Sequence, residues 1–160
     1  MRDFHTEAAE VTPASLDDSF ALVAAVDRYP EWCPDAVRAV DILERGADGY
    51  VSSVRMRMHI ARGAIVRDFN LYLAIAVEPL AFVKLRRFTD HPTNQEFHAT
   101  WLLRPAASTR IELQLDAKLR VPPYIPAGGI PHAIAKGFVS AACRALAARQ
   151  PDAQRAAHPD

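Results

Sequence analysis

The chain lacks the features of exported and membrane-spanning proteins. Nowhere do about 18 apolar residues follow one another without interruption, the length that a membrane-spanning helix needs. Residues 1–7 include charged side chains where a signal peptide would have an apolar stretch. We therefore expect a cytoplasmic protein without stable membrane insertion.

An excess of charge of either sign is also absent. The formal net charge is zero, from 19 Lys and Arg residues against 19 Asp and Glu residues. No global electrostatic field would then hold the protein on a nucleic acid or on an anionic membrane. We expect no nucleic-acid partner.

Cysteine and the common metal-binding patterns are sparse. The two cysteines, Cys33 and Cys143, lie far apart and do not resemble a disulfide framework, so we expect both to be reduced and structural. The six histidines form neither an H-E-x-x-H pattern nor a Cys/His quartet. No glycine-rich phosphate-binding motif is present either. The sequence predicts no metal and no cofactor.

What the chain does have is ample apolar material for one domain. Half of the residues are hydrophobic and 24% are charged. A chain of this size buries roughly 70% of its unfolded surface. Such a core is large enough to leave some volume for a cavity.

The N-terminal part predicts a strand and then a short helix. Residues 2–11 form the expected strand, although their alternation is poor. Ser15 is a candidate helix N-cap, and Asp18 completes a capping-box-like start with negative charge at the positive end of the helix dipole. Leu16 and Phe20 recur at helical spacing and would form part of the buried side of this helix.

Two aromatic residues follow this helix between two prolines. Pro30 and Pro34 are expected to stop helical propagation, which leaves Tyr29 and Trp32 in a short loop. Both rings are large and amphipathic. They would either plug the core or line the mouth of a pocket.

From residue 37 onward, apolar and polar residues alternate with a period of two. This pattern predicts six strands, over residues 37–43, 50–61, 65–77, 81–88, 96–103 and 109–120. The alternation gives the sheet one dry face and one wet face. Basic residues at 84, 86 and 87 are interpreted as part of the solvated outer face.

One charged residue interrupts the dry face. Arg67 occupies an apolar-face position in the strand over residues 65–77. A guanidinium there must find a partner, because a buried unpaired charge is prohibitively costly. Alternatively, a bulge or the strand end lets Arg67 reach solvent.

A long helix closes the chain. Prolines and glycines end the strand pattern, and a helix is predicted over residues 132–149, with Pro151 ending it. Residues 151–160 are expected to form a disordered tail.

This order of elements resembles the START-like (SRPBCC) superfamily. The local matches are Tyr29-Pro30-Glu31-Trp32 after the first helix, Trp101-Leu102-Leu103-Arg104-Pro105 followed by Thr109-Arg110-Ile111, and Phe138 to Leu146 in the last helix. Tyr29 followed by Trp32-Cys33 is similar to the polyketide cyclase/dehydrase and coenzyme Q-binding group. The resemblance implies an α+β helix-grip fold, with a curved antiparallel sheet of about seven strands wrapped around the C-terminal helix. Residues 1–150 would form this ligand-binding domain.

The resemblance also implies an apolar cavity between sheet and helix. We expect a volume of about 300 Å³ or more, within the usual range of ligand pockets. The candidate ligand-binding residues are Tyr29, Trp32, Met56, Met58, Arg67, Phe69, Leu71, Trp101, Leu113, Leu115, Ile134 and Phe138. The ligand would be a small hydrophobic molecule, lipid-like, isoprenoid or polyaromatic.

Three functions remain open at this point. The first is binding or transport of that ligand, by a monomer or a homodimer. The second is a polyketide cyclase/aromatase, in which Arg67 is the candidate catalytic residue. The third is an interaction protein with a vestigial cavity. We expect binding without turnover, because no acid, base or nucleophile stands at a spacing that requires chemistry.

Overall fold

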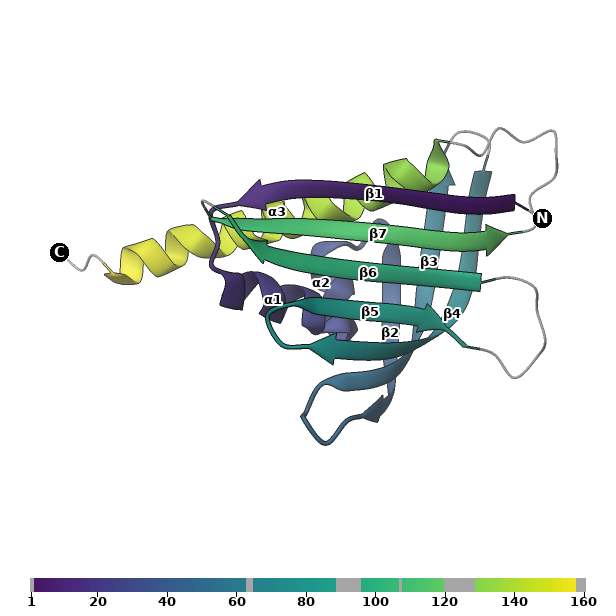
Figure 1. The fold of residues 1–160 in the computed structure, drawn as a ribbon, viewed down its shortest axis with the longest axis horizontal. Helices are drawn as coiled ribbons and strands as arrows, with labels where there is room; N and C mark the ends of the chain where they lie inside the picture. The colour runs from purple at the N-terminus through teal and green to yellow at the C-terminus, as the bar shows by residue number, and fades with distance from the viewer. Residues whose placement is uncertain (1, 63–64, 89–95, 107, 120–128, 158–160) are drawn as a thin grey trace.

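The computed structural model describes residues 2–62, 65–88, 96–106, 108–119 and 129–157 (Figure 1). Its elements are β1 (Arg2–Thr12), α1 (Leu16–Ala24), the 3-10 turn η1 (Val26–Arg28), α2 (Tyr29–Trp32), β2 (Val37–Arg45), β3 (Val51–Arg62), β4 (Ile65–Glu78), β5 (Phe82–Arg87), β6 (Glu96–Pro105), β7 (Thr109–Leu119) and α3 (Ile130–Ala157). Residues 89–95, between the predicted strands over 81–88 and 96–103, lie outside the described residues, as do residues 63 and 64 between the strands over 50–61 and 65–77.

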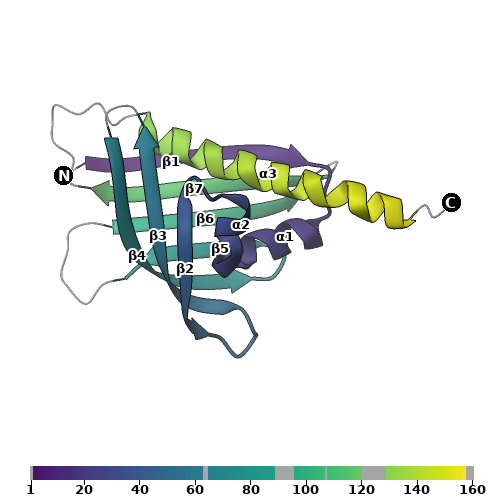
Figure 2. The ribbon, with the colours of Figure 1, turned by 180° about the vertical axis from the view of Figure 1, so that it is seen from behind.

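All seven strands form one antiparallel sheet. Their order is β1-β7-β6-β5-β4-β3-β2, so β1 and β7, the first and last strands along the sequence, pair with each other. The helices lie on one face of the sheet: α3 runs alongside β1 and β7, α1 lies over β5, β6 and β7, and α2 contacts the edge strand β2 and α3 (Figures 1 and 2). The predicted seven-stranded α+β helix-grip fold is confirmed.

The period-two alternation places the apolar side chains between the sheet and the helices. On β3, Val54, Met56 and Met58 are buried, whereas Arg55 and Arg57 between them are exposed. The exposed side chains pair across strands, as Arg55 does with Asp41 on β2. The sheet therefore has the dry and wet faces that the sequence predicted.

The start of α1 follows the predicted cap. The Ser15 hydroxyl accepts a hydrogen bond from the Asp18 backbone N–H at 3.0 Å. Asp17 and Asp18 lie in the first turn, where the helix dipole favours negative charge. This helix holds Phe20 and Val23 in the core.

Tyr29 and Trp32 lie in a one-turn helix, α2, and the prediction of a loop was wrong. Pro30 stands in the first turn of α2, where the missing N–H would have had no helical partner and the fixed φ suits a helix. Proline at this position starts a helix and does not stop one.

The helix α3 starts and ends outside its predicted bounds. It begins at Ile130 and continues through Pro151 to Ala157, so the prediction that Pro151 ends it was wrong. A proline removes one hydrogen bond from a helix and need not interrupt the remaining turns. The C-terminal part of α3 projects beyond the sheet (Figures 1 and 2).

None of the helices within the described residues has the length and hydropathy to cross a membrane.

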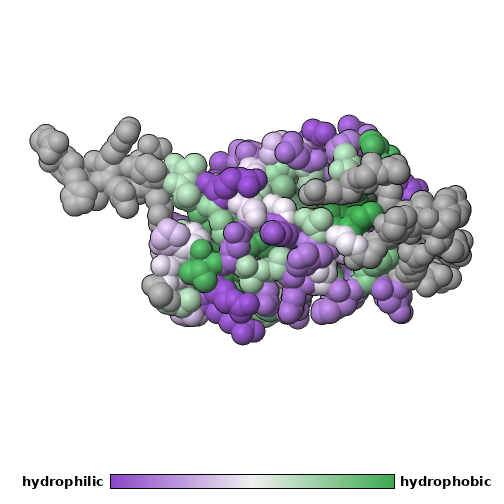
Figure 3. Space-filling view, turned by 90° about the horizontal axis from the view of Figure 1, so that it is seen from above, coloured by the Kyte–Doolittle hydropathy of each residue, from purple (hydrophilic) through white to green (hydrophobic). Residues whose placement is uncertain are grey.

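In the view from above, hydrophilic and hydrophobic residues are interspersed over the described part of the face (Figure 3). Scattered apolar residues of this kind are normal on a protein surface.

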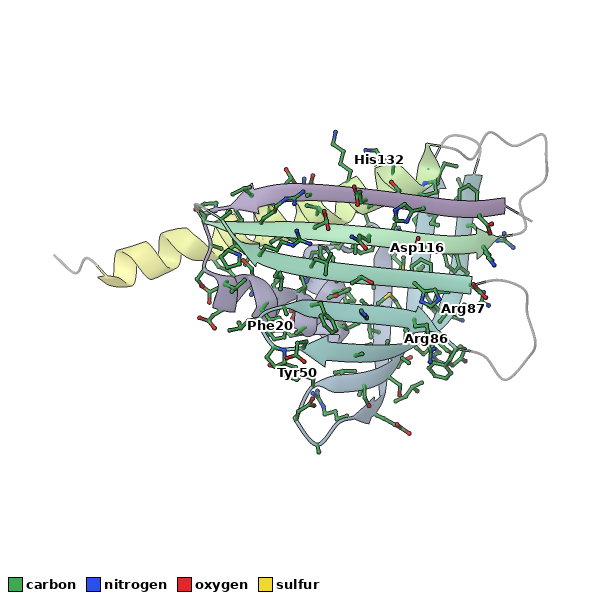
Figure 4. All side chains as sticks on the ribbon, in the orientation of Figure 1. Phe20, Tyr50, Arg86, Arg87, Asp116 and His132 are labelled. Carbon is green, nitrogen blue, oxygen red and sulfur yellow. The ribbon has the colours of Figure 1, made fainter. Side chains whose placement is uncertain are left out.

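One outward-facing pair makes the stability depend on pH. His5 on β1 lies opposite Asp116 on β7, which Figure 4 labels, and their side chains form a hydrogen-bonded ion pair on the exposed face. The hydrogen bond to Asp116, followed by its charge, raises the pKa of His5 above its ordinary value of 6.5.

We therefore expect an NMR titration to give His5 a pKa above 6.5. Because the folded-state pKa is raised, the pair's stabilising contribution is fully present below the unfolded pKa and is lost as the pH rises through the folded pKa. In an Asp116→Asn variant the pKa of His5 should return toward its ordinary value. An unchanged pKa in that variant would show that Asp116 is not the cause.

Candidate functional site

The apolar faces of the sheet and of α3 meet around a cavity of about 40 Å³. Its lining comes from α2, from five strands and from the first half of α3. The lining residues are Tyr29, Met56, Met58, Leu71, Leu85, Phe97, Ala99, Trp101, Leu113, Leu115, Ile134 and Phe138. We take this cavity as the candidate site, because here the two layers of the fold bring their apolar side chains together.

Most of the candidate residues from the sequence meet at this cavity. Nine of the twelve line it, and the other three, Trp32, Arg67 and Phe69, do not. Sequence reasoning missed Leu85, Phe97 and Ala99 as site residues. Phe97 and Ala99 could have been found, because they share the face of Trp101 along β6.

The cavity is much smaller than predicted. The sequence analysis expected about 300 Å³ or more, and side chains fill nearly all of that space. Trp101 is 1% exposed and Leu113 is 2% exposed, as in a normally packed core. Alternation shows which side chains point inward. It does not show how closely the facing layers pack.

The polar atoms of the lining are paired with one another. The Tyr29 hydroxyl donates to the Val23 backbone carbonyl at 2.6 Å and accepts a hydrogen bond from the Trp101 side chain. Burial raises the pKa of Tyr29, so this phenol stays protonated. Because its hydrogen-bonding groups are used, Tyr29 is not free to move a proton to or from a ligand.

Trp32 stands behind the wall of the cavity. Its ring makes edge-to-face contacts with Tyr29, Trp101 and Phe138, with centroid distances of 4.9, 6.3 and 6.5 Å. All three neighbours line the cavity. Trp32 therefore supports the lining from behind, with part of its own surface exposed.

Arg67 is not brought to the cavity. It lies near the start of β4, opposite Ile60 on β3, and its side chain is exposed. The neighbouring Val66 is 71% exposed, so this end of the strand extends beyond the core. Of the two sequence alternatives, the exposed strand end describes Arg67.

A different arginine shares the inner face of the sheet. Arg87 at the end of β5 is paired with Leu73, which is 1% exposed, and residues opposite each other in a ladder point to the same face. Arg87 is half-buried, and Figure 4 labels it at the end of β5. The sequence analysis assigned it to the solvated face. Its spacing of two from Leu85, which lines the cavity, is the signal that could have revealed it.

A larger hollow of about 660 Å³ lies elsewhere, between α1, η1, the β2–β3 hairpin and the β4–β5 turn. Phe20 and Tyr50 meet edge to face in its wall (Figure 4). Arg28, also in its wall, is paired with Glu31. This groove is open and partly charged, and it lies outside the space between the sheet and α3. Volume alone does not make it the site.

The thiols offer no reactive group. Cys33 and Cys143 are both free, as expected. Burial raises the pKa of each thiol to about 11, so both are protonated near neutral pH and are weak nucleophiles. Among the described residues, no group of three His, Cys, Asp or Glu side chains could hold a metal ion.

Solved structures share this architecture. A START superfamily protein from Mycobacterium smegmatis superposes with a TM-score of 0.68 at 21% identity, over 91% of this chain and 95% of that one. The Zhui aromatase/cyclase from Streptomyces sp. R1128 gives 0.65 at 18% identity, over 99% and 98%. Major latex-like protein 151 from Panax ginseng gives 0.63 at 13% identity, over 92% and 97%. These similarities show that the chain has the same helix-grip fold as these structures.

The amino-acid sequence also identifies the family to which the chain belongs. Residues 12–148 match the family model described as polyketide cyclase/dehydrase and lipid transport. The chain belongs to this family. A search of curated protein sequences found no match.

Proposed function

We propose that the protein binds a small hydrophobic ligand, lipid-like, isoprenoid or polyaromatic, between the sheet and α3. The observation that carries this proposal is the chemistry of the cavity lining. Ten of its twelve residues have no polar side-chain atom, and the remaining two, Tyr29 and Trp101, hydrogen-bond to each other. Such a surface favours apolar ligands through the hydrophobic effect.

Binding requires the cavity to enlarge. A volume of about 40 Å³ has room for little more than water, so side chains must move before a ligand enters. Met56 and Met58 line the cavity, and methionine changes its shape easily because it has three rotatable bonds and no branch. Ile134 and Phe138 form the α3 side of the lining. We expect these four residues to rearrange around the ligand.

A titration with 2-ethylnaphthalene tests the proposal. We expect saturable binding by calorimetry, and native mass spectrometry of protein from its own host should show a co-purifying apolar compound. An Ala99→Leu variant fills the cavity and should weaken binding at least 10-fold, with melting temperature as the check on folding. Equal binding by this variant would place the ligand elsewhere, and the groove beside Phe20 would then be the next site to test.

A second candidate function is a polyketide cyclase/aromatase. The family description includes cyclases, and a half-buried arginine, Arg87, shares the inner face of the sheet. A guanidinium on that face would stabilise a developing enolate. Product analysis on an unreduced polyketide mimic separates the two functions: a cyclase forms product that Arg87→Leu abolishes and the exposed-site control Arg67→Leu retains. We expect no product above background.

The small cavity also favours the third alternative, an interaction protein with a vestigial cavity. That alternative predicts no saturable binding of any apolar probe and no effect of Ala99→Leu beyond stability. A cytoplasmic location and a homodimer stay predictions from the sequence.

A further inference from the structure

One buried donor next to the cavity lacks an acceptor. The Trp32 indole Nε1 is shielded from solvent and has no hydrogen-bond partner within the part of the chain that the structure describes. A buried N–H without a partner costs free energy, and native proteins keep few of them. Packing does not require this nitrogen, because phenylalanine would also fill an aromatic position in α2.

None of the three side chains whose rings contact Trp32 accepts a hydrogen bond from its N–H. Tyr29, whose ring centroid is 4.9 Å from that of Trp32, already accepts from Trp101 and donates to Val23. The other two ring neighbours, Trp101 and Phe138, offer no side-chain oxygen. Trp32 is thus a free donor among three residues that line the cavity.

We propose that the Trp32 N–H donates a hydrogen bond to an oxygen atom of the bound ligand. This inference rests on the proposed function and adds the chemical class: an apolar body that carries one acceptor oxygen, as in a ketone, quinone or phenol. Phe138 is one of the residues expected to rearrange around the ligand, and its ring also makes an edge-to-face contact with the Trp32 ring, at 6.5 Å between centroids. A ligand that displaces the Phe138 ring would take its place beside the Trp32 ring, within reach of the indole N–H.

The test compares two probes of nearly equal shape, 2-acetylnaphthalene and 2-ethylnaphthalene, which differ in one carbonyl oxygen. Both are titrated into the wild-type protein and into Trp32→Phe. The measured quantity is the ratio of the two dissociation constants, because this ratio cancels changes in packing and stability that affect both probes. We expect Trp32→Phe to reduce the preference for the ketone about 10-fold, the scale of one buried hydrogen bond.

An NMR titration of the wild-type protein gives a second readout that needs no variant. The indole N–H resonance of Trp32 should shift downfield with the ketone and not with the hydrocarbon. The Trp101 N–H also lies at the cavity but already binds Tyr29, so it is the internal control: the ring current of either probe should shift it by a similar amount, with little difference between ketone and hydrocarbon.

The two probes distinguish failure of the Trp32 hydrogen bond from failure of ligand binding. If both probes bind but the ratio is the same in Trp32→Phe, the indole N–H is not a ligand donor, and a contact with a neighbouring ring face is the better account of it. If neither probe binds the wild-type protein, the proposed function fails and this inference fails with it.

Discussion

Replacing Trp101 with alanine is expected to lower the free energy of unfolding by about 3–5 kcal/mol. Trp101 is the largest of the side chains that are less than 2% exposed. Its loss would leave a void between β6 and α2, where it meets the Trp32 ring at 6.3 Å. It would also remove the donor that the Tyr29 hydroxyl accepts from, which adds to the cost.

Urea denaturation measures this loss as a decrease in the unfolding midpoint. Tyr72→Ala is the matched control, because it removes another aromatic ring from the same sheet at a site that is 43% exposed. The control should cost about 1 kcal/mol or less. Equal losses in the two variants would mean that the core between the sheet and the helices is not where the stability of the fold resides.

Replacing Phe138 with alanine is expected to raise the affinity for 2-ethylnaphthalene about 10-fold while it destabilises the protein. Phe138 lines the cavity from α3 and is 8% exposed. Its ring must move before a ligand can enter, and the free energy of that movement reduces the affinity of the wild-type protein. The variant holds the space open in advance, at a stability cost of about 3 kcal/mol. Calorimetry and urea denaturation measure the two effects.

Phe20→Ala is the control for this variant. Phe20 is 4% exposed, so its removal should cost similar stability, but it lies in α1 and does not line the cavity. Its affinity for the probe should stay at the wild-type value. A gain in both variants would indicate a general loosening of the fold, and a gain in neither would show that opening at α3 does not limit binding.

The fold could be predicted because its signals are local. Period-two alternation along β3 and β7 determines which face of each strand is dry, and one dry face per strand is sufficient to define a sheet that must be covered. Ser15 and Asp18 mark a helix start through backbone groups within one turn of each other. Most of the strands and the long C-terminal helix were therefore predicted from neighbouring residues, whereas their arrangement as a helix-grip fold was predicted from the resemblance to the START-like superfamily.

The same signals identified most of the cavity lining. Met56, Met58, Leu113 and Leu115 line the cavity because they occupy inward positions of their strands, which alternation reveals. Local rules failed where the neighbours were prolines. Pro30 lies in the first turn of α2, where a missing N–H leaves no helical hydrogen bond unmade, and α3 continues through Pro151 although one hydrogen bond is lost there.

Only the tertiary structure decided which inward-facing side chains are buried and how closely the sheet and the helices pack. Arg67 and Arg87 occupy equivalent inward positions of their strands, yet one is exposed near a strand end and the other is half-buried opposite Leu73. Alternation carries no information on how far the core extends along a strand. The cavity volume and the unpaired Trp32 N–H depend on distances between residues remote in sequence, which are determined by packing across the two layers.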